Sequence, residues 1–245
     1  MIQVLTPPQR FTAAEVGRNA LSERAMIVDL SLSAWGAKRL DRATTNEVIT
    51  AKGAAKDAGT WHKLLVPEGA LDAVTKAHSR AGARHRELTL PWGENGRILS
   101  AAAWFDYSQA MAEERTNCER AHREFVALYP ELVRGAPARL GPTFCASDFP
   151  AADMIARRFA FKLEVMPVPH HDDFRVHLGD DIEAHIRREI ESTVGSRQDE
   201  AQRELWTRLL KTVRHFATTM AEEGKTFQKT TVSNLIDIAT LAPKL

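Results

Sequence analysis

The sequence predicts an α+β fold, in which a small antiparallel sheet packs on a mainly helical bundle that contains two long helices. Three observations support this fold class: period-two alternation near 26–34, a second alternating region over 158–178, and two long stretches whose apolar residues recur every seven positions. The chain has 245 residues, which is enough to bury a sizeable core. We expect one domain over 1–245, with residues 1–10 as a loose N-terminal lead-in.

The N-terminal region predicts a short helix followed by the first strand. Residues 11–25 are typical of a helix, because Thr12 with Glu15 three positions later forms a capping pair. From residue 26 to residue 34 the period changes to two, which indicates a strand with one buried face. The apolar face of this strand consists of Met26, Val28, Leu30, Leu32 and Ala34.

The next region predicts two helices and a turn. The helices are expected over 42–57 and 68–88, and the composition of PWGENG (91–96) is typical of a turn. The apolar side of the second helix includes His78 and His85, which lie two turns apart. Because two turns span about 10 Å, these histidines are too far apart to share a metal ion, and we interpret them as partly buried helix residues.

Two long helices are predicted from repeats of seven residues. The first runs from about Leu99 to Leu132, and the second from about 196 to 223. Their apolar repeats are Trp104, Met111, Cys118, Phe125 and Leu132 in the first helix, and Trp206, Val213 and Met220 in the second. Repeats of this kind predict that the two helices pack together, antiparallel, with Cys118 as a small core residue. A short last helix is expected at about 229–241.

A β-hairpin is predicted over 158–178, between the two long helices. In FAFKLEV (159–165) and in FRVHL (174–178), apolar residues alternate with polar ones, and the proline-bearing segment MPVPHHDD joins them. Phe159 and Phe161 lie on the apolar face of the first strand, so we expect them in the core.

Composition and charge narrow the possible functions. The net charge of +1 gives no overall signal of nucleic-acid binding, so a basic surface has to be local. Two cysteines, Cys118 and Cys145, are too few for a disulfide framework, and the sequence shows no secretory signal and no membrane span. We therefore expect a cytoplasmic protein. No phosphate-binding loop, dinucleotide fingerprint or nucleophile elbow is present.

The stretch PHHDDFRVHLGDDIEAH (169–185) is the densest group of metal-ligating residue types. Adjacent histidines on an extended chain point apart, so we expect His170 and His171 not to converge. Asp180 with Glu183 three residues later is typical of a helix N-cap with its reciprocal partner. We therefore interpret the stretch as turn and capping residues and expect no metal and no cofactor, with a metal-dependent hydrolase as the alternative.

A basic segment is the stronger functional candidate. Residues 76–86, KAHSRAGARHR, contain no acidic residue, and tryptophans lie before and after them in the sequence. Basic side chains that hold phosphates next to flat rings that stack bases are typical of single-strand binding sites. The alternative is a solvated basic helix beside core tryptophans. The candidate nucleic-acid-binding residues are Trp61, Lys63, Lys76, Arg80, Arg84, Arg86, Trp92, Arg97, Arg158 and Lys162.

Two segments carry a resemblance to a known family. IVDLSLSAWGAKRLDRA (27–43) and AADMIARRFAFKLEVMPV (151–168) resemble a domain-of-unknown-function family of phages, plasmids and integrative elements, often encoded near a MoxR/CobS-like AAA+ ATPase. The organisation is also similar to that of the Drc-type single-stranded-DNA-binding RNA polymerase cofactors of N4-like phages. The resemblance implies a mobile-element context in a bacterial host cell, and it provides no catalytic residues to transfer.

We therefore expect a non-enzymatic protein of a phage or mobile element that binds single-stranded DNA and assists transcription, replication or recombination. A phage RNA polymerase or an AAA+ ATPase is the expected protein partner, and no membrane is expected. One alternative is a helical adaptor that docks on such an ATPase or polymerase. The other is a metal-dependent hydrolase that uses residues 169–185. A homo-oligomer, and RNA in place of DNA, stay open.

Overall fold

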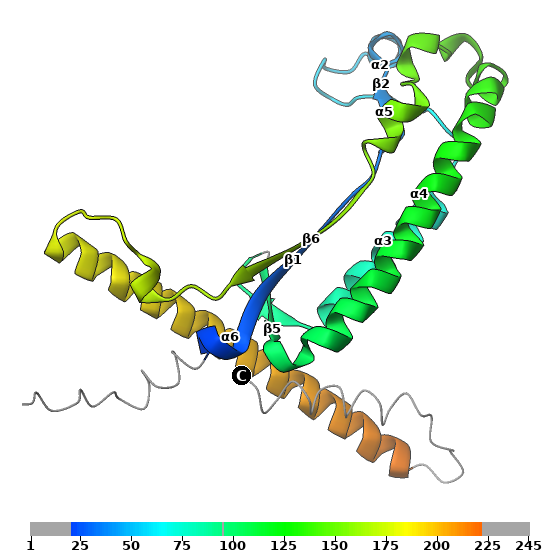
Figure 1. The fold of residues 1–245 in the computed structure, drawn as a ribbon. Helices are drawn as coiled ribbons and strands as arrows, with labels where there is room; N and C mark the ends of the chain where they lie inside the picture. The colour runs from blue at the N-terminus through cyan, green and yellow to red at the C-terminus, as the bar shows by residue number, and fades with distance from the viewer. Residues whose placement is uncertain (1–20, 95, 222–245) are drawn as a thin grey trace, which may run out of the picture. The chain divides into compact units, whose positions relative to one another are not determined.

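The computed structural model describes residues 21–94 and 96–221. It confirms the α+β class, with long helices and a small antiparallel sheet (Figure 1). The predicted lead-in, most of the predicted first helix and the predicted last helix lie outside the described residues. Among the described residues, no helix combines the length and the apolar character needed to cross a membrane.

The chain forms two compact units, which we describe separately. Among the described residues, unit 1 contains 21–29, 85–94, 96–109 and 163–221, and unit 2 contains 30–84 and 110–162. The chain crosses between the units inside two strands and two helices, so neither unit is a continuous piece of sequence.

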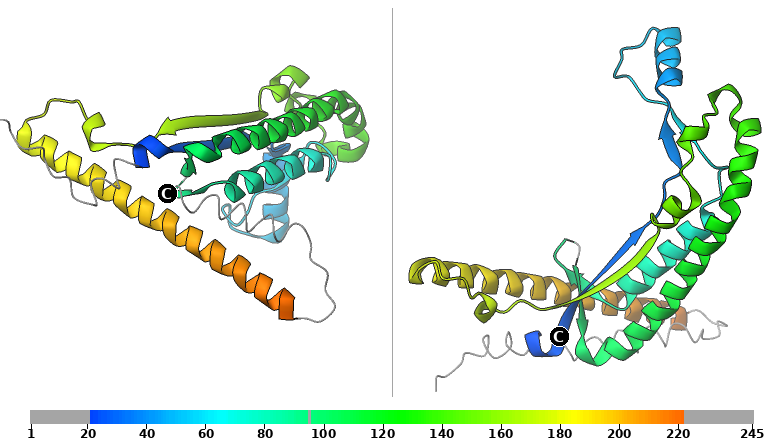
Figure 2. Two further views of the ribbon diagram at one scale, coloured as in Figure 1. Left: turned by 60° about the horizontal axis from the view of Figure 1, so that its bottom comes forward. Right: turned by 45° about the horizontal axis from the view of Figure 1, so that its top comes forward.

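The main sheet has the strand order β4-β5-β1-β6. Strand β1 (Ala25–Ser33) confirms the predicted first strand, and it lies beside β6 (Ala160–Pro167) in Figures 1 and 2. On its other side β1 pairs antiparallel with β5 (Gly96–Ser100), with Val28 opposite Arg97. The edge strand β4 (Leu90–Trp92) pairs antiparallel with β5.

The segment 91–96 is more than the predicted turn, because it contributes to both strands of a hairpin. The chain reverses after Trp92, with Gly93 at a φ of 70°, and Trp92 pairs with Gly96. Pro91 is compatible with this strand because β4 lies at the sheet edge, where a missing N–H breaks no ladder.

The predicted hairpin over 158–178 is wrong in its second half. Strand β6 pairs with β1, and residues 174–178 form no strand. Pro167 and Pro169 end β6 because they cannot donate to a ladder. The alternation in FRVHL does not reflect a buried face, since Val176 is 57% exposed. The prediction that Phe159 and Phe161 lie in the core is confirmed: Phe161 is buried, and Phe159 packs against the core of unit 2.

The shorter elements of unit 2 surround a second, two-stranded sheet. Strands β2 (Lys38–Leu40) and β3 (His62–Leu64), which the sequence did not predict, pair antiparallel. Helix α2 (Arg42–Lys52) lies between them in the sequence. It begins after Asp41, whose carboxylate accepts from the N–H of Thr44, and it ends at Lys52, with Gly53 as its C-cap, rather than near 57. Gly53 adopts a φ of 60°, which stops the helix.

Helix α3 (Asp72–Glu87) and helix α4 (Trp104–Leu140) lie side by side in unit 2 (Figures 1 and 2). The predicted apolar repeat of α4 is confirmed, because Met111, Cys118 and Phe125 are buried. Within its own unit, α4 packs against α3, whose Val74 shares a core cluster with Phe125. Helix α4 begins later and ends later than predicted and contains Pro130 and Pro137.

The remaining short elements of unit 2 follow α4. They are the 3-10 turns η2 (Gly141–Thr143) and η3 (Ala146–Asp148) and the single-turn helix α5 (Ala152–Ala156). Tyr129 of α4 ties this region down, because its hydroxyl donates to the carbonyl of Pro150 at 3.0 Å. The ring of Trp35, in turn, lies edge-on to Tyr129 with 5.5 Å between centroids.

Helix α6 (Asp180–Ala221) is the main helix of unit 1 and begins well before the predicted position near 196. It packs on β4, and Ala201 and Leu205 are buried in a core cluster that includes Trp92. The predicted apolar repeat of α6 is wrong as a core repeat: Trp206 is 61% exposed and Val213 is 45% exposed. The sequence predicted that α6 packs against the other long helix, α4, through this repeat. Because the repeat residues Trp206 and Val213 are exposed, that prediction is wrong for α6.

Candidate nucleic-acid interface

A hollow between α3 and α4 collects part of the predicted basic segment. It has a volume of about 290 Å³ and lies entirely in unit 2. Its lining residues are Ala73, Lys76, Ala77, Arg80, Asn117, Arg120, Ala121 and Glu124. We call these residues the α3–α4 hollow. On each helix the four residues are spaced i, i+3, i+4 and i+7, so they form one stripe on each helical surface.

The α3–α4 hollow carries three cations and one carboxylate. Lys76, Arg80 and Arg120 are exposed, and three alanines leave room between them. Two of the cations are held in place by neighbours: Arg80 Nε lies 2.9 Å from Glu114 Oε2, and Arg120 Nη2 donates to Asn117 Oδ1 at 3.0 Å. A guanidinium has five N–H donors, so one such contact orients it without exhausting its capacity to bind a phosphate.

A pair of histidines also joins α3 to α4. His78 Nε2 and His122 Nε2 lie 2.7 Å apart, so one ring donates and the other accepts. Burial lowers the pKa of both histidines, and the neighbouring His78 lowers the pKa of His122 further. Both are therefore neutral near pH 7, and they hold α3 against α4 without adding charge.

A second cavity of unit 2 lies on a different flank of α4. A separate cavity of about 410 Å³ is lined by His122, Arg123 and Val126 of α4 together with Phe159, which stacks on His122. Because α4 turns once every 3.6 residues, these α4 residues face away from the flank that carries Asn117, Arg120 and Glu124. Arg158 and Lys162 are exposed but do not line the α3–α4 hollow.

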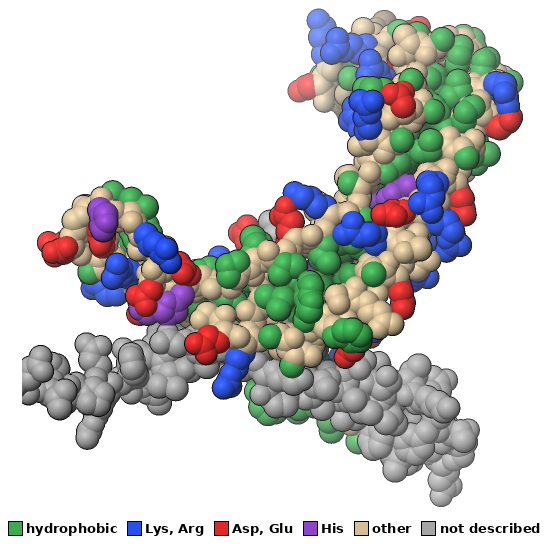
Figure 3. All heavy atoms as spheres, in the orientation of Figure 1, with side chains coloured by type: hydrophobic (Ala, Val, Ile, Leu, Met, Phe, Trp, Pro, Cys, Tyr) green, Lys and Arg blue, Asp and Glu red, His purple; other side chains and the backbone are tan. Residues whose placement is uncertain are grey.

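Charge of both signs is present along the visible side of α4. Figure 3 shows basic and acidic side chains interspersed there. Arg123, for example, lies 4.0 Å from Glu119, and Arg115 sits over the ring of Phe161 at 5.0 Å. The excess of cations over carboxylates in the α3–α4 hollow is therefore a local property.

Lys63 forms ion pairs and a hydrogen bond inside unit 2, rather than facing a ligand. Its side chain is 6% exposed, and its ammonium lies 2.6 Å from a carboxylate oxygen of Asp148 and 3.6 Å from one of Asp41. It also donates to the carbonyl of Thr143 at 2.8 Å. All of these partners lie in unit 2, where Lys63 ties β3 to the chain that follows α4. The ammonium is thus engaged inside the fold and is not offered to a ligand.

Trp61 retains a partly open ring. It is 37% exposed and borders an apolar groove of about 240 Å³ along α2, next to Val48, Ile49 and Lys52. This groove and the α3–α4 hollow share no lining residue. Trp61 is the candidate stacking ring that keeps an accessible face among those that the sequence suggested.

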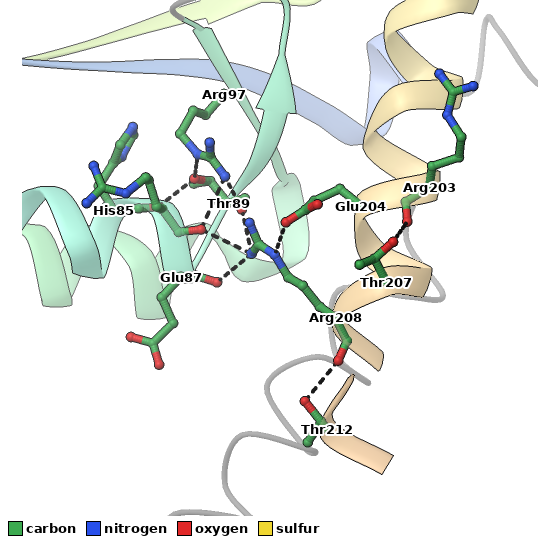
Figure 4. A network of polar contacts seen from close by, with 10 residues as sticks. His85, Glu87, Thr89, Arg97, Arg203, Glu204, Thr207, Arg208 and Thr212 are labelled. Carbon is green, nitrogen blue, oxygen red and sulfur yellow. Dashed lines mark hydrogen bonds and ion pairs between the residues drawn. The ribbon is translucent and has the colours of Figure 1, made fainter. Parts of the chain in front are cut away.

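Three candidate residues, Arg86, Trp92 and Arg97, lie in unit 1. The side chains of Trp92 and Arg97 are engaged in contacts inside the fold. Trp92 is 2% exposed and belongs to the core, so it offers no face to a base. Arg97 donates to the side-chain oxygen of Thr89 at 2.6 Å and to the carbonyls of Thr89 and Arg86 (Figure 4). Burial, followed by the charges of Arg208 and Arg86, lowers the pKa of Arg97 to about 10.

Arg97 and Arg208 together hold the carboxyl end of α3. Arg208 of α6 donates to the carbonyls of Arg86, Glu87 and Thr89, and its Nε lies 2.9 Å from Glu204 (Figure 4). Cations at the C-terminus of a helix bind carbonyls that have no partner in the helix and interact favourably with its dipole. Arg86 keeps an exposed side chain, whereas Arg84 is half-buried.

Sequence reasoning missed the α4 side of the hollow. Arg120, with its partner Asn117, lies in EERTNCERAHRE, whose alternating charges are typical of a solvated helix face. The available signal was the polar repeat at 117, 120 and 124, which has the spacing of one helical face. That repeat becomes informative only when α3 is known to lie beside it.

The histidine-rich stretch also differs from expectation. The rings of His170 and His171 lie 4.1 Å apart between centroids instead of pointing away from each other. The chain is not extended there, because residues 171–173 form the 3-10 turn η4 (His171–Asp173), with His170 as its N-cap. The predicted cap of α6 is wrong in its residue, because Asp180 is the first residue of the helix rather than its N-cap, and Glu183 accepts from the N–H of Leu178 at 3.0 Å.

No family model, curated protein or solved structure matches the chain.

Proposed function

We propose that the protein is a non-enzymatic single-stranded-DNA-binding protein of a phage or mobile element, acting in the cytoplasm of a bacterial host in transcription, replication or recombination. The observation that carries this proposal is the α3–α4 hollow, where Lys76, Arg80 and Arg120 converge on one depression. Convergent cations around a hollow suit a phosphodiester backbone, because each cation neutralises a phosphate and releases a counterion.

Two observations favour single-stranded DNA over duplex DNA as the ligand. One is the resemblance of residues 27–43 and 151–168 to proteins of phages and mobile elements. The other is Trp61, which lies in the same unit as the hollow and keeps part of its ring accessible. An aromatic ring can stack on a base only where the base is not already stacked inside a duplex, and such stacking contributes about 1–3 kcal/mol per base.

A titration with a fluorescently labelled single-stranded oligonucleotide tests the proposal. We expect binding at low salt that weakens as salt rises, and about a tenfold or greater loss of affinity in the triple variant Lys76→Glu, Arg80→Glu and Arg120→Glu. The matched control reverses three exposed cations of α6, through Arg203→Glu, Lys211→Glu and Arg214→Glu, and therefore changes the net charge equally.

Two results would contradict the proposal. The first is no binding by the unmodified protein at low salt. The second is an equal loss of affinity in the two triple variants, because this would assign binding to net charge rather than to the α3–α4 hollow.

An adaptor that docks on a polymerase or an AAA+ ATPase is the second candidate, and a separate observation favours it. Trp206, Leu210 and Val213 are spaced i, i+4 and i+7 on α6, and each is 45–61% exposed. An exposed apolar stripe of this spacing suits a partner helix. This candidate function predicts that the chain co-purifies with a partner protein. The complex should survive high salt, and it should be lost in the double variant Trp206→Lys with Leu210→Lys. A complex that dissociates in high salt would contradict the adaptor function.

A further inference from the structure

We propose that the η4 turn, together with Glu191 of α6, is a binding site for a divalent transition-metal ion of the zinc class. The site lies in unit 1 and shares no residue with the α3–α4 hollow. The proposal goes beyond nucleic-acid binding and does not depend on it.

The ligand atoms are brought together by the turn. One ring nitrogen of His170, one ring nitrogen of His171 and one carboxylate oxygen of Asp172 all lie within 4.8 Å of one another. The carboxylate of Asp172 approaches both rings: one oxygen lies 3.3 Å from His171 Nε2 and the other lies 3.5 Å from His170 Nδ1. Three side chains from consecutive positions thus converge because the backbone curls into a 3-10 turn.

Glu191 adds a contact from a second element. Its carboxylate lies 3.5 Å from His171 Nδ1, on the opposite ring nitrogen from the one that faces Asp172. In protein metal sites a ligating histidine usually donates its other N–H to a carboxylate, which fixes the ring and makes it a better ligand. His171 has this arrangement, with Nε2 directed at the ligand cluster and Nδ1 held by α6.

The turn has its own support, which leaves His171 available for a ligand role. The backbone N–H of His170 donates to the carboxylate of Asp173, and the N–H of Asp172 lies 3.3 Å from His170 Nδ1. These contacts form a capping box that involves His170 and Asp173. The side chain of His171 takes no part in it, so His171 can be changed without removing the cap.

The ligand types select the class of metal. Two imidazoles and one carboxylate suit zinc and its neighbours among the transition metals, whereas magnesium and calcium prefer oxygen ligands. Ligands about 2.0–2.1 Å from a tetrahedral ion lie about 3.4 Å apart, so ligand atoms that now lie within 4.8 Å of one another have to close by up to about 1.4 Å on binding. Three protein ligands leave a fourth position for water.

Isothermal titration of the full-length, untagged protein with Zn²⁺ alone tests the site. We expect binding of one ion, loss of that binding in His171→Ala, and about a tenfold loss of affinity in Glu191→Gln. Glu191→Asp should restore part of the affinity. Circular dichroism of the metal-free variants should match that of the unmodified protein, which separates loss of a ligand from loss of the fold.

The matched control uses two histidines of the same stretch that lie outside the turn. His177 is 98% exposed at its side chain and His185 is 65% exposed, and we expect His177→Ala with His185→Ala to leave Zn²⁺ affinity unchanged. Binding that survives His171→Ala, or that falls equally in the His177/His185 variant, would overturn the proposal. So would the absence of stoichiometric binding by the unmodified protein.

Discussion

At the scale of single residues, several ionisable side chains do their work inside the fold rather than on its surface. His85 is buried at 6% exposure, and its Nδ1 lies 2.8 Å from the hydroxyl of Tyr107. Burial, with smaller contributions from the charges of Arg97 and Arg86, lowers the pKa of His85 to about 4. Burial also raises the pKa of Tyr107. Both groups are therefore neutral at pH 7, where they form an uncharged hydrogen bond.

The lowered pKa of His85 predicts the direction of the pH dependence of stability. The unfolded state, in which the histidine pKa is about 6.5, binds a proton that the folded state does not. The free energy of unfolding should therefore fall as the pH drops from about 6.5 to about 4, by on the order of 2 kcal/mol. Urea unfolding at pH 7.5 and at pH 5 measures this fall.

The matched variants isolate the contribution of His85. In His85→Gln the fall between pH 7.5 and pH 5 should become smaller, whereas His177→Gln, at an exposed position, should leave it unchanged. His78 and His122 also have lowered pKa values and contribute in the same direction, so some dependence remains in every variant. An unchanged fall in His85→Gln would contradict this account of the residue.

Lys63 provides a second prediction at this scale. Burial alone lowers its pKa, but the hydrogen bond and charge of Asp148, followed by the charge of Asp41, more than offset that effect and raise it. Lys63→Ala should reduce the free energy of unfolding by about 1–2 kcal/mol, because the half-buried carboxylates of Asp41 and Asp148 lose the ammonium that they share, while Arg39 stays 3.4 Å from Asp148. Urea unfolding measures the loss. In Lys38→Ala, at an exposed position of β2, stability should stay within about 0.5 kcal/mol.

At the scale of secondary-structure elements, the end of α2 depends on one glycine. Gly53 has a φ of 60°, and its N–H donates to carbonyls at the end of the helix. A Cβ added there would meet no atom within 4 Å, so the cost of a side chain is purely conformational. Gly53→Ala should destabilise the protein by about 1 kcal/mol. Gly36→Ala, also without a close contact but without a positive φ, is the control, and equal effects would contradict the explanation.

The sequence predicts the buried face of an element where its apolar pattern coincides with the residues that are buried. It fails where burial or strand pairing depends on segments that are distant in the sequence. The apolar repeat of α4 reports a buried face, since Met111 and Cys118 lie in the core, whereas the single buried face predicted for β1 is wrong because Val28 and its neighbour Ile27, on opposite faces, are both buried. The repeat of α6 misled because Trp206 lies on an exposed face while its neighbour Leu205 is buried. The segment FRVHL misled because alternation does not reveal whether a partner strand exists; here β6 pairs with β1, which is distant in sequence.

At the scale of the whole molecule, the candidate residues are divided between the two units. Lys76 and Arg80 could be named from the acid-free segment, and the structure places both in the α3–α4 hollow. Trp92 and Arg97 could not be assigned correctly from composition. Their burial depends on contacts with α6, which lies about a hundred residues away in the sequence.

The salt dependence of single-stranded DNA binding tests the central claim most directly. For a single strand, the logarithm of the binding constant falls linearly with the logarithm of salt concentration, with a slope of about −0.7 for each phosphate contact. Reversing Lys76, Arg80 and Arg120 together should therefore make the slope shallower by about 2, whereas the Arg203, Lys211 and Arg214 control should keep the original slope. Equal slopes for the unmodified protein and the hollow variant would contradict the account.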